Sequence, residues 1–257
     1  MTVKVLRDGA IAHVVLARPE VRNAFNSELV ATLHRTFDAL AEDASVRTIV
    51  LAGEGRTFCG GADIGWMRDS LDLTAEQNVE DARAMSRMLR AIDRIEKPTI
   101  ARIHGAALGG GIGLAAVCDI AIAAADAVFG FTETKLGILP AVISPFVLAK
   151  IGSSHARALA LTGERFDAQR ALSIGLVHEV VSPEALTAAV GRVCREIESA
   201  SPAGIAAAKA LFAAVAESSY DESLETTARA IATQRTSPEG QEGLRAFLEH
   251  RPAAWSR

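Results

Sequence analysis

The sequence predicts an α/β protein that ends in a helical layer. Apolar, strand-like runs and amphipathic helical patterns share roughly the first two-thirds of the chain of 257 residues. From about residue 144, alanine-rich helical patterns follow one another with a single strand-like interruption. The stretch from Thr99 to Val117 joins an apolar strand to a buried helix through three consecutive glycines. A chain of this length can bury a large core as one domain.

The individual elements follow from apolar periodicity and from turn and cap residues. Asp8-Gly9 is typical of a hairpin turn between two apolar runs, and Asn26 or Ser27 can cap the first helix. Strands are expected near residues 3–6, 11–16, 48–51, 99–103, 119–124, 128–131 and 176–181. Helices are expected near residues 29–40, 76–95, 145–151, 154–162, 167–174, 184–199, 203–217, 222–235 and 239–249.

No Gly-, Ser- or Pro-rich linker divides the chain. We therefore interpret residues 1–195 as an α/β core and residues 196–257 as a C-terminal helical region of the same domain. No apolar run reaches the ~18 residues that a membrane span needs. The net charge of −4, without basic clusters, argues against nucleic acid and anionic membranes as partners.

Cysteine usage and the N-terminus favour a cytoplasmic protein. Cys59, Cys118 and Cys194 are widely spaced and odd in number, which suits a reducing compartment and indicates no zinc site. The first residues enter a strand-like pattern directly, with no signal-peptide pattern.

Two glycine turns are candidates for an oxyanion hole. Gly60-Gly61-Ala62-Asp63 and Gly109-Gly110-Gly111 each follow a strand-like run. Backbone N–H groups at a helix N-terminus have no partner within the helix, and two that converge stabilise charge on a carbonyl oxygen. The alternative is that these glycines only permit tight turns and close packing.

Glu133 is the candidate acid–base residue. It lies just past an apolar strand, and Leu136, Ile138 and Leu139 follow it. A carboxyl group in apolar surroundings has a raised pKa and can exchange protons near neutral pH. The alternative is an exposed loop glutamate paired with Lys135.

A dinucleotide-binding pattern also occurs and is rejected. Gly111-Ile112-Gly113-Leu114-Ala115-Ala116 fits G-x-G-x-x-A, and Glu133 follows at about the 20-residue spacing of that fingerprint. However, extended structure resumes near residue 119, and the rear third lacks further alternating strands.

Several motifs together resemble a known family. They are Arg18-Pro19 with Asn23-Ala24-Phe25-Asn26, Thr57-Phe58-Cys59-Gly60-Gly61-Ala62-Asp63-Ile64, His104–Gly111, Cys118-Asp119-Ile120 and Phe129–Pro140. Over nearly its whole length the chain resembles the crotonase (enoyl-CoA hydratase/isomerase) superfamily. The resemblance implies a crotonase-like spiral of repeated ββα units in two stacked sheets. It also implies a C-terminal helical trimerisation region, with homotrimers that usually pair into hexamers.

The resemblance also implies the site residues. The amides of Ala62 and Gly110 would hold the thioester oxygen of an acyl-CoA, and Glu133 would be the general acid/base. Coenzyme A would enter as part of the substrate, with no separate cofactor and no metal. Its expected contacts are Arg22, near the phosphates, and Ala24, Gly60, Gly61, Ala62, Asp63, Ile64 and Gly110. The acyl pocket is expected to be walled by residues 67–73, 85–89 and 140–146.

One position departs from the family pattern. Hydratases of the superfamily typically carry two glutamates; the second aligns with Glu133, whereas the first aligns with Gly113. Single-acid relatives are often isomerases, but Gly113 together with the run from Glu133 to Pro145 resembles a bacterial subgroup of methylglutaconyl-CoA or related branched enoyl-CoA hydratases. The prediction is an enoyl-CoA hydratase. The alternatives are an enoyl-CoA Δ-isomerase that uses Glu133, and a non-catalytic acyl-CoA or RNA-binding scaffold.

Overall fold

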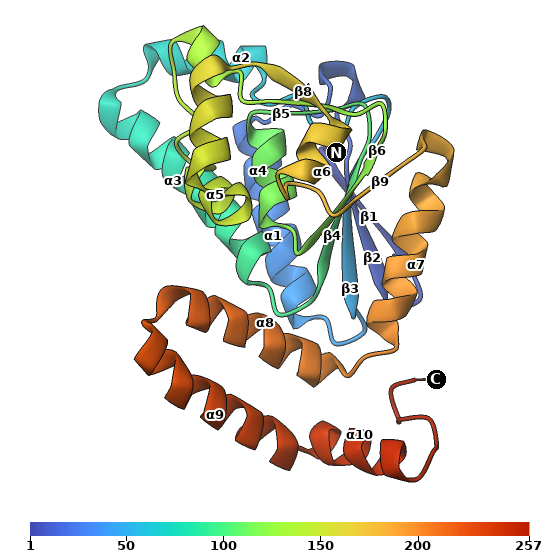
Figure 1. Ribbon diagram of the computed structural model, residues 1–257. Helices are drawn as coiled ribbons and strands as arrows, with labels where there is room; N and C mark the ends of the chain where they lie inside the picture. The colour runs from blue at the N-terminus through green and yellow to red at the C-terminus, as the bar shows by residue number, and fades with distance from the viewer. Residues whose placement is uncertain (257) are drawn as a thin grey trace.

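The chain folds into a core of two β-sheets with surrounding helices, and a helical extension lies beneath the core (Figure 1). The computed structural model describes residues 1–256. The large sheet has six strands in the order β1-β2-β3-β4-β6-β9, and the small sheet has the order β5-β7-β8. Their bounds are β1 Val3–Asp8, β2 Ile11–Leu16, β3 Thr48–Gly53, β4 Thr99–Ile103, β5 Ala106–Leu108, β6 Ile120–Ala124, β7 Val128–Gly130, β8 Arg165–Asp167 and β9 Glu179–Val181.

Helices cover both faces of the large sheet and continue into the C-terminal extension (Figure 1). They are α1 Ser27–Glu42, α2 Ile64–Asp69, α3 Ala75–Arg94, α4 Gly110–Val117, α5 Ser144–Thr162, α6 Ala168–Ser173, α7 Leu186–Glu198, α8 Pro202–Glu217, α9 Tyr220–Thr236 and α10 Pro238–Leu248. In the part of the chain that the structure describes, no single helix is long and apolar enough to cross a membrane. Only α7, with the short turn before it, and α8 meet that criterion together, as a pair bent by 101°.

The central strands are apolar because the large sheet is buried on both faces. Ile49 and Leu51 of β3 pack on the side of α1 and α3, whereas Val50 packs on the side of α7. The strands β2, β3, β4, β6 and β9 run parallel to one another. The expected hairpin is confirmed, since β1 pairs antiparallel with β2 around Gly9, which has a φ of 55°.

Most of the expected elements are present, with shifted ends. Asn26 is the N-cap of α1, and its side chain accepts a hydrogen bond of 2.9 Å from the Leu29 N–H. The break expected between two helices occurs inside α5 at Gly152, whose φ of 71° is not helical. The strands β5 and β8 were not expected, because three residues are too few to show a period. The strand expected from residue 176 begins only at Glu179.

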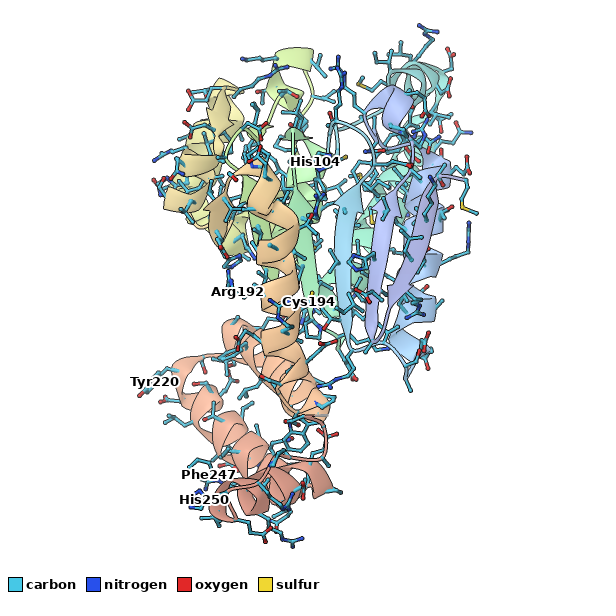
Figure 2. The ribbon with its side chains drawn as sticks, turned by 90° about the vertical axis from the view of Figure 1, so that its right-hand side faces the viewer. His104, Arg192, Cys194, Tyr220, Phe247 and His250 are labelled. Carbon is cyan, nitrogen blue, oxygen red and sulfur yellow. The ribbon has the colours of Figure 1, made fainter. Side chains whose placement is uncertain are left out.

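The last three helices stand apart from the sheet core (Figures 1 and 2). In contrast, α7 belongs to the core, because Leu186, Ala189, Val190 and Cys194 pack against the large sheet. The expected boundary at residue 195 therefore lies within α7, and the chain leaves the core only after Glu198.

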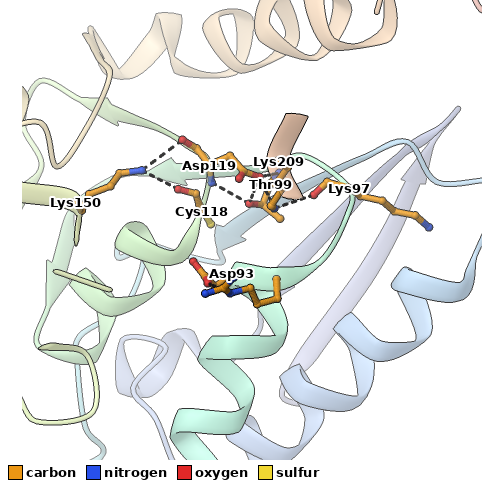
Figure 3. Close-up of polar contacts among 8 residues, drawn as sticks. Asp93, Lys97, Thr99, Cys118, Asp119, Lys150 and Lys209 are labelled. Atoms are coloured by element: carbon orange, nitrogen blue, oxygen red, sulfur yellow. Dashed lines mark hydrogen bonds and ion pairs between the residues drawn. The ribbon is translucent and has the colours of Figure 1, made fainter. Parts of the chain in front are cut away.

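A polar cluster attaches α8 to the core (Figure 3). The Asp119 Oδ2 atom accepts hydrogen bonds from the Thr99 N–H at 2.7 Å and from the Lys209 Nζ at 2.8 Å. Lys150 donates from Nζ to the Cys118 carbonyl at 2.9 Å. The side chains of Lys209 and Asp119 are only 17% and 32% exposed. Because solvent screens this ion pair only partly, we infer that it stabilises the position of α8.

We expect Lys209→Met to lower the free energy of unfolding by about 1–3 kcal/mol, because the partly buried Asp119 carboxylate would lose its cation. Arg229→Met is the matched control, since Arg229 pairs with Glu225 on an exposed helix face where such a pair contributes about 0.3–0.5 kcal/mol. Urea unfolding of both variants measures the difference. Equal losses in the two variants would contradict a special role for Lys209.

Candidate active site

The first glycine turn is held by parallel backbone pairing with the segment around Phe25. The Phe25 N–H donates to the Gly61 carbonyl at 2.7 Å, and the Asp63 N–H donates to the Phe25 carbonyl at 2.9 Å. Ala62 lies between the two residues, Gly61 and Asp63, that bond to Phe25. In a parallel pairing such a residue directs its own N–H away from the partner segment. Accordingly, the Ala62 N–H has no hydrogen-bond acceptor within residues 1–256.

The helix α4 supplies the second amide. Gly109 is its N-cap, with a φ of 49°, and the Gly109 N–H donates to the Gly130 carbonyl at 2.9 Å. Gly110 is the first residue of α4, so its N–H has no carbonyl partner inside the helix, and no other described residue accepts from it. A Cβ atom on Gly110 would lie 2.8 Å from the Phe25 ring and 2.9 Å from the Met85 methyl group. The close packing therefore requires glycine at this position.

A second parallel pairing brings the two turns together. The Cys59 N–H donates to the Ala106 carbonyl, and the Leu108 N–H donates to the Cys59 carbonyl, both at 3.0 Å. Residues 57–61 and 104–108 therefore run side by side, and the two glycine turns lie at the same end of these paired segments. Ala62 and Gly110, whose amides have no partner, directly follow these two paired segments in the chain.

A buried amide fixes the chain that precedes Phe25. Arg22 and Asn23 have left-handed φ values of 58° and 55°, which residues other than glycine seldom adopt. The Asn23 side chain is fully buried. Its Oδ1 accepts from the Arg18 N–H at 2.9 Å, and its Nδ2 donates to the Thr57 carbonyl at 2.7 Å and to the Glu54 carbonyl at 2.9 Å. These bonds hold the strained conformation and orient Arg22.

Arg18 connects this segment to the first glycine turn. Its guanidinium donates to the Ala24 carbonyl at 2.6 Å and to Asp63 Oδ2 at 2.7 Å. The other oxygen of Asp63 accepts from the Gly65 N–H at 2.7 Å, so Asp63 caps α2. In the sequence, Arg18 was singled out only as part of the motif Arg18-Pro19, without a role in the site. The one available signal was a charged residue two positions after an apolar strand.

Glu133 is the first residue of a short 3-10 helix, Glu133–Leu136. Its carboxyl group lies against the start of α4. Its Oε1 atom is 2.9 Å from the position that a Cβ of Gly109 would occupy. Its Oε2 atom is buried and has no hydrogen-bond partner among the described residues. Loss of hydration raises the pKa of Glu133, although its own backbone N–H partly opposes the shift. No ion pair with Lys135 occurs within residues 1–256, so the alternative of a paired loop glutamate is wrong.

The space beside Gly113, where the family's first glutamate would stand, is filled by Ile143. The Ile143 side chain is 2% exposed, and its Cγ2 lies 2.3 Å from the position of a Cβ on Gly113. No side chain larger than that of glycine fits at residue 113 unless Ile143 moves. Sequence analysis could not detect this contact, because 30 residues separate its two partners.

The predicted CoA contacts surround the first glycine turn. Arg22 and Gly60 line a cavity of about 210 Å³ together with Arg165 of β8. Ala62 and Ile64 are exposed, whereas Ala24 and Gly61 are buried and can offer only backbone groups. Sequence analysis missed Arg165, because it did not predict β8. The CoA contacts themselves stay predictions.

The remaining candidates have structural roles. His104 donates from Nε2 to the Gly55 carbonyl at 2.9 Å and so stabilises the neighbouring turn, and burial lowers its pKa. Within residues 1–256, no group of three or more His, Cys, Asp or Glu side chains is arranged to hold a metal ion.

Two unbonded backbone amides, one of them at the N-terminus of α4, together with a partly desolvated carboxyl group, are a combination typical of enzymes that move protons next to a carbonyl. Comparison with known proteins agrees with this class and refines it. The family model for enoyl-CoA hydratase/isomerase matches residues 7–257. The chain is 32% identical over 249 residues to the crotonyl-CoA hydratase of Syntrophomonas wolfei, which covers 96% of this chain and 95% of that protein.

Solved structures agree as well. An enoyl-CoA hydratase from Shewanella pealeana has a TM-score of 0.96 at 37% identity and covers 99% of this chain and 96% of that chain. An enoyl-CoA hydratase/isomerase from Marinobacter aquaeolei has a TM-score of 0.94 at 35% identity and covers 100% of this chain and 99% of that chain. The chain belongs to the enoyl-CoA hydratase/isomerase family and is an enzyme of the crotonase superfamily. The predicted crotonase-type α/β fold is thereby confirmed.

The buried carboxyl group of Glu133 has a consequence for stability. Because its pKa is raised, the folded protein retains a proton that the unfolded chain releases near pH 4.3, roughly the ordinary glutamate value. The stability from this group is therefore present below that pH and is lost as pH rises through the raised pKa. We expect Glu133→Gln to be more stable than the wild type at pH 8, and expect this advantage to disappear near pH 4.

Thermal unfolding at the two pH values measures this difference. The control is Glu164→Gln, since Glu164 is exposed and its substitution should change neither value. A stability difference between Glu133→Gln and the wild type that is the same at both pH values would contradict the desolvation of Glu133.

Proposed function

We propose that the protein is an enoyl-CoA hydratase, which adds water across the 2,3 double bond of an acyl-CoA thioester. The observation that carries this proposal is the position of the Glu133 carboxyl beside Gly109 at the start of α4, where the next residue, Gly110, has an unbonded amide. The names of the crotonyl-CoA hydratase and the enoyl-CoA hydratase among the relatives support the same reaction.

In this mechanism Glu133 first acts as a base. Its carboxylate accepts a proton from water while the water oxygen bonds to C3, and the electrons of the double bond move toward the thioester oxygen. The Ala62 and Gly110 N–H groups stabilise the resulting enolate. The protonated Glu133 then returns a proton to C2, and the enolate collapses to a 3-hydroxyacyl-CoA.

The CoA part of the substrate would lie along the first glycine turn. The cavity that contains Arg22 and Arg165 offers two cations, which suit the phosphates of CoA. No separate cofactor is needed. For the acyl part we propose a branched, methylglutaconyl-like group, in line with the resemblance of Gly113 and residues 133–145 to that subgroup. The buried thiols of Cys59, Cys118 and Cys194 suit a reducing compartment, and we propose the cytoplasm.

The second candidate is an enoyl-CoA Δ-isomerase, and one specific observation favours it. Ile143, rather than a second carboxyl group, fills the space beside Gly113. A hydratase of this family typically uses that second carboxyl to hold the attacking water. An isomerase needs only one carboxyl, which removes a proton from C2 of a 3-enoyl-CoA and returns it to C4.

Incubation with crotonyl-CoA and 3-methylglutaconyl-CoA in heavy-oxygen water separates the two reactions. We expect one heavy oxygen in a 3-hydroxyacyl-CoA product, detected by mass spectrometry. Glu133→Gln should lower turnover by at least about 100-fold, a typical contribution of general acid–base catalysis, and should leave CoA binding unchanged. Conversion of a 3-enoyl-CoA to its 2-enoyl isomer without label in any product would select the isomerase instead.

We also propose that α8, α9 and α10 assemble the protein into trimers or pairs of trimers. These helices stand apart from the core, and Tyr220 and Phe247 project from them (Figure 2). The side chains of Phe212, Tyr220, Phe247 and Leu248 are 73%, 78%, 79% and 74% exposed. Several large apolar side chains exposed on one helical unit are typical of a protein–protein interface.

Light scattering coupled to gel filtration should give a mass of three or six chains for the wild type, and we expect Phe247→Asp to weaken this assembly. Leu161→Asp is the control, because Leu161 is equally exposed, at 74%, but lies on α5. A monomeric wild type, or equal dissociation of both variants, would contradict the proposed interface.

A further inference from the structure

We propose that Ile143 limits the length of the acyl group, because it separates the catalytic site from an apolar cavity behind it. This inference rests on the proposed function, since it concerns the acyl part of the same substrate. It predicts a preference for short acyl groups in the wild-type protein, and it assigns that preference to one side chain.

The acyl part of the substrate would follow one face of α4. Gly109 and Gly113 are one turn apart, and the Gly113 N–H donates to the Gly109 carbonyl at 3.3 Å. Glu133 lies against Gly109, and Ile143 lies against Gly113. Glu133 and Ile143 therefore contact the first part of α4 about one turn apart. An acyl group whose thioester oxygen is bound by the Gly110 amide, and whose double bond lies beside Glu133, would extend its remaining carbons toward Ile143.

The cavity also borders Ile143 and is partly open at the surface. Its volume is about 200 Å³, and its lining includes Phe131, Ile143, Val147, Leu148 and Ala160. It is bounded by both halves of α5, which change direction at Gly152. With this mainly apolar lining, the cavity offers room for several methylene groups of a longer acyl chain.

Three properties make Ile143 a fixed partition rather than a gate. It is 2% exposed, and it packs against Gly113 on one side while it lines the cavity on the other. Its carbonyl accepts from the Val147 N–H at 3.0 Å, which ties it to the first turn of α5. Its β-branched side chain also has few accessible rotamers.

The test compares the hydration of crotonyl-CoA with that of trans-2-octenoyl-CoA. Ile143→Ala should raise the octenoyl-to-crotonyl ratio of kcat/KM by at least about 10-fold, the lower limit for one methylene group in an apolar pocket. Ile143→Val keeps the partition and should keep the wild-type ratio. If Ile143→Ala does not fold, as judged by thermal unfolding, Ile143→Cys makes the same test with a smaller loss of apolar contact.

A second substitution shows whether the longer chain enters this cavity. Ala160→Leu would fill the cavity from the α5 side. In the Ile143→Ala background it should remove the gain on octenoyl-CoA, whereas alone it should leave the wild-type ratio unchanged. A gain that persists in the double variant would overturn the assignment of the cavity.

The two proposals fail in different ways. A folded Ile143→Ala protein that hydrates crotonyl-CoA with the wild-type chain-length ratio would overturn the inference about Ile143 and leave the hydratase intact. A wild-type protein that hydrates none of the tested enoyl-CoA substrates would overturn the proposed function itself.

Discussion

The site depends on parallel backbone pairing among three chain segments. Residues 22–25 bond to residues 60–63, and residues 57–61 bond to residues 104–108. Buried backbone groups need partners, and this pairing supplies many of them. The amides of Ala62 and Gly110 stay unbonded within the described residues, because the pairing directs one outward and a helix start leaves the other without a carbonyl partner. Arg18 and Asn23 act on the same segments, so their buried bonds maintain the geometry of the site.

The electrostatics of the site follow from the same arrangement. The N-terminus of α4 carries partial positive charge and faces the site, while its C-terminal end meets the ammonium group of Lys150 through the Cys118 carbonyl (Figure 3). The partly positive N-terminal end of this buried helix thus faces the site that contains the Glu133 carboxyl group, and its partly negative C-terminal end faces the Lys150 ammonium group. Glu133 is held beside the N-terminal end with one oxygen unbonded, which costs stability and raises its pKa. The same loss of hydration makes the carboxyl group useful for proton transfer near neutral pH.

Gly113 and Ile143 connect the chemistry to the choice of substrate. The contact between Ile143 and Gly113 places an apolar side chain where other hydratases of the family carry a second glutamate. In the proposed binding mode, the same side chain limits how far an acyl chain can extend along α4. A single carboxyl group must then handle both proton transfers, whichever of the two reactions occurs. Because the interior is closely packed, a change at either residue alters the space available to the other.

The sequence by itself determined the α/β class, the two glycine turns, the cap at the start of the first helix, and Glu133 as the candidate acid–base residue. Each of these leaves a local signal, such as a period, a turn or a cap, within a few residues. Only the tertiary structure decided that Arg18 pairs with Asp63, that Arg165 lines the cavity with Arg22, and that Ile143 fills the space beside Gly113. These contacts join residues 30 or more positions apart. They depend on how strands and helices pack, which local periodicity does not encode.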